Sequence, residues 1–103
     1  MNHRDRKLLD LAHRLHDCTI RIPGVCQGHS VEGLEPAHAN WSRYGKGMGI
    51  KAHDCFHAAA CHACHAEIDQ GKRLSQEERI DYWQQGFERT LLIYHRNGWL
   101  KPC

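Results

Sequence analysis

Six cysteines and ten histidines among 103 residues supply this chain with many side chains that can bind a metal ion. Four of the cysteines form two pairs, Cys18 with Cys26 and Cys61 with Cys64. Four thiolates can bind Zn²⁺ in a tetrahedral structural site. Because a chain of this length buries only a thin hydrophobic core, such an ion would contribute a large part of its stability. We therefore expect a structural zinc ion on these four cysteines. The alternatives are buried free thiols, disulfides and a site with mixed cysteine and histidine ligands.

The segment CHACH at residues 61–65 also contains C-x-x-C-H, which is the attachment pattern of a c-type haem. Haem attachment usually accompanies export, and the first residues of the chain contain no secretory signal. A haem would also leave the first cysteine pair without a role, so we expect a metal ion and no haem. Cys55 is expected to be a small buried hydrophobic residue, and Cys103 to lie at a frayed end.

A histidine and a carboxylate form a second candidate metal site. If residues 61–70 are helical, His65 and Asp69 are four residues apart and share one face of the helix. Such a pair can hold a divalent ion and leave positions open for water and a phosphate group. His38 lies in an expected strand, and Asp54 lies between the two histidines in the chain.

The order of these residues resembles that of the HNH, or His-Me finger, nucleases, and more narrowly that of the YbcO-like prophage nucleases. The resemblance rests on the segments CTIRIPGVC, AH and ACHACHAEID and covers about residues 14–72. It implies a ββα-metal core in which His38 is the general base and Asp54 is the central residue. It also implies that His65 and Asp69 bind a catalytic Mg²⁺ or Mn²⁺ ion. DNA is the implied substrate, and the cytoplasm of a bacterial host is the implied location.

Two residues depart from the pattern of that family. The central residue is Asp54 where the family has Asn, and Ala37 stands where many members have a metal-binding Asp or His. The resemblance therefore implies either a weak metal site or one in which another side chain helps to hold the ion. Glu35 and His53 are both candidates, and the sequence does not rank them.

A basic, glycine-rich segment follows His38. Residues 41–53 contain three basic residues and no acidic residue. Basic side chains contact phosphates, glycines permit close approach, and aromatic rings stack on unpaired bases. We expect this segment to contact DNA through Arg43, Lys46, Lys51, Trp41 and Tyr44.

The hydrophobic spacing predicts the elements that must position these groups. A capping box at Ser75–Glu78 marks the start of the last helix, Asn97-Gly98 marks its end, and Gly86 weakens its interior. The predicted elements are a helix over 4–16, a strand over 18–22, a strand around His38, a strand end or helical turn over 54–60, a helix over 61–70 that Gly71 stops, and a helix over 76–97.

These elements predict one α+β domain over residues 1–103, with a zinc-stabilised ββα core between an N-terminal helix and a long C-terminal helix. The net charge of +2 does not by itself indicate a nucleic-acid partner, and no apolar run reaches the about 18 residues of a membrane span. The alternative function is a non-catalytic zinc module that binds nucleic acid. Only the enzyme requires His38. The remaining histidines are assigned to the surface or to packing: His3, His13, His16, His29, His57, His62 and His95.

Overall fold

A computed structural model describes residues 6–39, 41 and 56–99. Its elements, in chain order, are α1 (Arg6–Asp10), the 3₁₀ turn η1 (Leu11–Arg14), β1 (Glu35–His38), β2 (His57–Ala60), α2 (His62–Gln70) and α3 (Gln76–Arg96). The described part of the chain is therefore an α+β structure built around one small sheet. None of the helices in this part is long and apolar enough to cross a bilayer.

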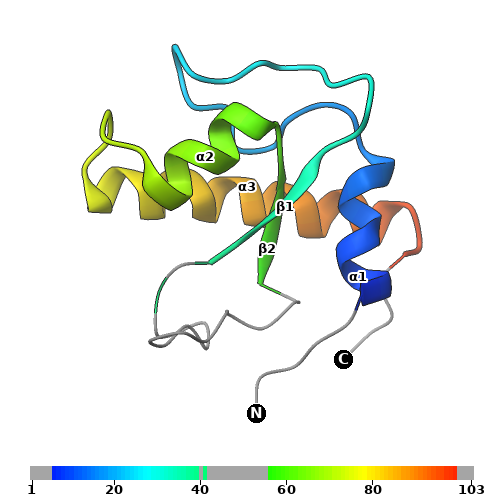
Figure 1. Cartoon of the computed structure of the whole chain (residues 1–103). Coiled ribbons are helices and arrows are strands. Elements are labelled where there is room, and N and C mark those ends of the chain that lie inside the picture. The colour runs from blue at the N-terminus through cyan, green and yellow to red at the C-terminus, as the bar shows by residue number, and fades with distance from the viewer. Residues whose placement is uncertain (1–5, 40, 42–55, 100–103) are drawn as a thin grey trace.

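Strands β1 and β2 pair antiparallel, with Glu35 opposite Ala60 and His38 opposite His57. α3 crosses behind this sheet, and α2 starts directly after β2 (Figure 1). The indole Nε1 of Trp83, fully buried on α3, donates a hydrogen bond of 2.9 Å to the carbonyl oxygen of Ala37. This bond ties the long helix to the strand that carries Glu35 and His38.

The predicted starts of the second and third helices are confirmed. Cys61 is the N-cap of α2, and Gly71 follows the last residue of that helix. Ser75 and Glu78 form the capping box of α3. The buried carboxylate of Glu67 accepts backbone N–H groups in the connection between the two helices, at 3.1 and 3.3 Å. This carboxylate fixes how the end of α2 meets the beginning of α3.

The predicted strand over residues 18–22 is wrong. Arg21 has a φ of 59°, which interrupts the extended conformation. In this segment Thr19 meets the sheet: its backbone N–H and its hydroxyl both donate to the carbonyl oxygen of Ala59, at 3.1 and 2.6 Å. β propensity does not make a strand here, because the chain has to bend toward the second cysteine of the first pair.

The predicted helix over residues 4–16 ends earlier than expected. α1 passes into η1, which stops at Arg14, and Leu15 is already extended with a ψ of 155°. The carbonyl oxygen of Leu15 accepts the backbone N–H of Leu34 at 2.9 Å. A hydrogen bond to a residue far along the chain thus replaces the last helical turn.

Candidate functional site

The four paired cysteines lie together, as predicted. The sulfur atoms of Cys18, Cys26, Cys61 and Cys64 are all within 4.8 Å of one another. Cys18 and Cys26 come from the bent segment before β1, whereas the other two come from the first turn of α2. Three of them are buried, and Cys26 is half-buried. The cluster can therefore hold a metal ion, whereas haem attachment would engage only two of its sulfurs.

Backbone N–H groups point at these sulfurs. Gln27 donates to the sulfur of Cys61 at 3.4 Å, and Gly28 donates to that of Cys26 at 3.3 Å. A hydrogen bond from the thiol of Cys64 lowers the pKa of Cys18, and sharing that proton raises the pKa of Cys64. A cation bound among these sulfurs would favour thiolate on both residues.

His65 is held between two carboxylates. Its Nδ1 lies 2.7 Å from Oε1 of Glu35, and its Nε2 lies 3.2 Å from Oδ2 of Asp69. The other oxygen of Glu35 lies 3.0 Å from Nδ1 of His62. The predicted pairing of His65 with Asp69 on one helical face is present, and Glu35 on β1 joins it from the opposite side of the ring.

These contacts surround His65 with the negative charge of two carboxylates. The contact with Asp69 raises the pKa of His65, the contact with Glu35 adds to this, and burial opposes it. Burial raises the pKa of Glu35, but the hydrogen bonds from His65 and His62 outweigh it, so that the pKa of Glu35 is lowered. Two carboxylates around one imidazole favour a cation, whether a proton or a metal ion.

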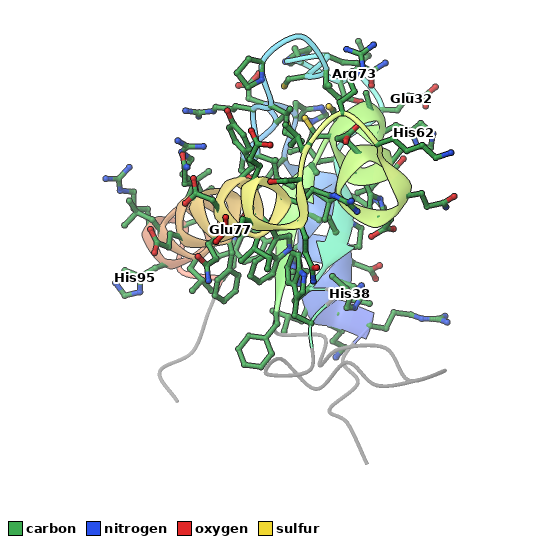
Figure 2. All side chains as sticks on the ribbon, turned by 90° about the vertical axis from the view of Figure 1, so that its left-hand side faces the viewer. Glu32, His38, His62, Arg73, Glu77 and His95 are labelled. Carbon is green, nitrogen blue, oxygen red and sulfur yellow. The ribbon has the colours of Figure 1, made fainter. Side chains whose placement is uncertain are left out.

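His38 ends β1, three residues after Glu35. Its ring centroid lies 6.4 Å from that of His57, the buried residue across the strand pair, whose Nε2 is 3.0 Å from the hydroxyl of Tyr94. Figure 2 shows His38 on the same side of α3 as His62, below α2, whereas His95 lies on the far side of α3. The role of His38 as general base stays a prediction.

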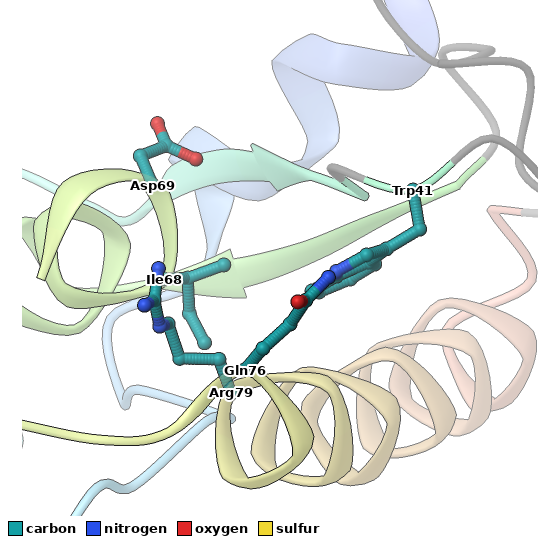
Figure 3. A pocket seen from close by; sticks show the side chains of 5 residues that line it. All are labelled: Trp41, Ile68, Asp69, Gln76 and Arg79. Atoms are coloured by element: carbon teal, nitrogen blue, oxygen red, sulfur yellow. The ribbon is translucent and has the colours of Figure 1, made fainter. Parts of the chain in front are cut away.

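A pocket of about 270 Å³ adjoins Asp69. It is lined by Trp41, Ile68, Asp69, Gln76 and Arg79, between the end of α2 and the first turn of α3 (Figure 3). The ring of Trp41 packs edge-on against Trp83, with centroids 5.6 Å apart. Trp41, predicted to contact DNA, is thus held by the core while it lines a pocket.

The remaining predicted site residues are Asp54, Arg43, Tyr44, Lys46, Lys51 and His53, and they lie outside the described residues. Sequence reasoning does not single out two members of this cluster: Glu35, the partner of His65, is one of two unranked candidates, and His62, which contacts Glu35, is assigned to the surface or to packing. A signal for Glu35 was present. Because side chains alternate along a strand, Glu35 shares the face of Ala37, the position where many HNH-type nucleases have a ligand.

The family model and the curated relatives that match this chain name the same family. A model described as "Putative nuclease YbcO" matches residues 7–99. Two curated proteins, "Putative nuclease YbcO" of Escherichia coli (strain K12) and "Putative nuclease ybcO" of Enterobacteria phage 82, are each 34% identical over 91 residues, which is 87% of this chain and 93% of each relative. The solved structure of a putative bacteriophage protein from Escherichia coli str. K-12 substr. MG1655 has a TM-score of 0.66 and 28% identity, and the match covers 87% of this chain and 98% of that chain.

Proposed function

Because the chain belongs to the YbcO family of putative nucleases, we propose that it is a metal-dependent endonuclease with an HNH-type ββα core that hydrolyses DNA. A relative in a phage supports a role in phage or prophage DNA processing, such as recombination. The observation that carries the proposal is the position of His65 between Glu35 and Asp69.

The His65 arrangement matches a divalent-metal site with a supporting carboxylate. An imidazole that donates through one nitrogen to a carboxylate is fixed in one tautomer, and its other nitrogen is the better ligand. Glu35 accepts from Nδ1, which directs Nε2 of His65 toward Asp69. A separation of 3.2 Å suits two neighbouring ligands of one ion. In this proposal His65 and Asp69 bind the ion. Glu35 positions His65 and so compensates for Ala37, which has no group that can bind a metal.

The sulfur cluster supports a structural zinc ion. Zinc–sulfur bonds of about 2.3 Å in a tetrahedron place the sulfurs about 3.8 Å apart, and the four observed sulfurs lie within 4.8 Å of one another. The cluster joins the bent segment before β1 to the first turn of α2. An ion there would fix the orientation of the helix that carries His65 and Asp69.

The chemistry requires a base and a stabiliser of negative charge. His38 takes a proton from the attacking water, whose oxygen bonds to phosphorus as the bond to the leaving oxygen breaks. His65 and Asp69 would hold a divalent ion, which would supply positive charge to offset the negative charge that develops on the phosphate and on the leaving oxygen. Asp54, which lies outside the described residues, is assigned the central role of orienting the base or supporting its loop.

The test is nicking of a supercoiled plasmid in the presence of Mg²⁺ or Mn²⁺. We expect His38→Ala to keep its fold and zinc content but to lose about 10²- to 10⁴-fold in rate, as expected for a lost general base. His95→Ala, an exposed histidine on the far side of α3, is the matched control and keeps wild-type activity. Equal nicking by His38→Ala and wild type would exclude His38 as the base. If wild type and both variants all bind DNA and none of them nicks it, the non-catalytic module is favoured.

A further inference from the structure

The pocket between α2 and α3 has walls that suit a nucleobase. Trp41 offers an aromatic ring and Arg79 a planar cation, on both of which a base can stack. The amide of Gln76 can both donate and accept hydrogen bonds, as the edge of a base can. At about 270 Å³ the pocket is smaller than the about 300 to 1,000 Å³ typical of sites for drug-sized ligands. It therefore suits one base rather than a larger group.

The side chain of Arg79 contains a hydrogen-bond donor that has no acceptor among the described residues. Its Nε is buried and has no hydrogen-bond partner among the described residues. A buried donor without an acceptor costs about 1 to 3 kcal/mol. Figure 3 shows the guanidinium of Arg79 extending from α3 toward Ile68 and Asp69 on α2. The cationic end of this side chain thus lies beside the pocket that Arg79 lines.

Asp69 connects the pocket to the proposed metal site. It is one of the residues that line the pocket. Asp69 also contacts Nε2 of His65. A base in the pocket therefore lies one side chain away from the pair proposed to bind the catalytic ion.

We propose that this pocket receives one unpaired base of the DNA strand whose phosphate lies at His65 and Asp69. The inference rests on the proposed nuclease function and names its substrate class: single strands, and duplexes with unpaired bases at ends, gaps or branches. A base inside a continuous duplex is stacked on both sides, and bringing it into the pocket costs a few kcal/mol. A continuous duplex is therefore the poorer ligand.

The experiment measures binding without added Mg²⁺ or Mn²⁺, so that it does not depend on cleavage. Zinc-loaded protein is titrated, at one fixed salt concentration, into a fluorescent single strand, a blunt hairpin duplex and a single strand of the same length in which every residue is abasic. We expect wild type to favour the normal single strand over both other probes. Trp41→Leu and Arg79→Gln should each weaken binding of that strand about tenfold. Their effect on the other two probes should not exceed that of the control.

The matched control is Arg96→Gln, which removes the same charge from an exposed position at the other end of α3. Because Trp41 packs against the core, Arg79→Gln keeps the test informative if Trp41→Leu lowers stability. If Arg79→Gln lost the same affinity for the normal strand as for the abasic strand, Arg79 would contact the DNA backbone. That result would overturn the inference. Selective base binding without nicking would leave the pocket in place and overturn the nuclease proposal. Nicking without selective base binding would overturn the inference about the pocket and leave the nuclease proposal in place.

Discussion

His65 is the residue at which distant parts of the chain meet. Asp69 lies one helical turn further on, whereas Glu35 comes from a strand 30 residues earlier. The spacing of His65 and Asp69 follows from helical geometry alone, so the sequence predicts it. The contact with Glu35 depends on how β1 lies against α2. No local pattern encodes that arrangement, and only the shared strand face with Ala37 hints at it.

The contact between His65 and Asp69 can be tested by titration. Asp69→Asn removes the carboxylate that most strongly raises the pKa of His65, so we expect this pKa to fall. The measurement is an NMR titration of the histidine ring signals in buffer without Mg²⁺ or Mn²⁺. Glu77→Gln, at an exposed position in the first turn of α3, should leave the pKa unchanged. An unchanged pKa in Asp69→Asn would contradict the geometry around His65.

α3 is the element that the sequence predicts best, and its one irregular residue has a structural reason. Gly86 weakens the helical pattern, but a Cβ atom there would lie 2.6 Å from Cγ1 and 3.1 Å from Cα of Ile20. The helix therefore has to lack a side chain where the bent segment before β1 crosses it. Thr90, one turn on, accepts the backbone N–H of Ala59 at 3.0 Å. The same approach explains why the predicted strand over 18–22 does not form: that segment packs on α3 instead of pairing along its length.

Gly86→Ala separates helix propensity from packing. Alanine favours a helix over glycine by about 1 kcal/mol, but crowding in a packed core costs about 1 to 3 kcal/mol. Because the neighbouring atoms belong to the buried side chain and the backbone of Ile20, we expect the variant to be destabilised by about 1 kcal/mol.

Urea unfolding, followed by circular dichroism, measures the effect. Glu88→Ala, at an exposed position of the same helix, is the control and should change stability by no more than about 0.5 kcal/mol. A Gly86→Ala protein more stable than wild type would show that Ile20 does not approach α3 as closely as described.

The whole molecule places two candidate metal centres on one short helix. Cys61 and Cys64 at the start of α2 face the first cysteine pair, while His65 and Asp69 face Glu35 and the pocket beside α3. The cysteine pairs, the helices and the family could be predicted from the sequence, because metal spacing, caps and periodicity are local. The bend after Cys18 and the pocket between α2 and α3 could not, because both arise from packing between distant segments.

The most direct test of this arrangement is anomalous diffraction from crystals of the zinc-loaded protein soaked in Mn²⁺. We expect a zinc peak among the sulfurs of Cys18, Cys26, Cys61 and Cys64, and a separate manganese peak bound by Nε2 of His65 and the carboxylate of Asp69. A zinc peak away from the four sulfurs would contradict the structural site. The absence of manganese at His65, or its presence only elsewhere, would contradict the proposed catalytic centre.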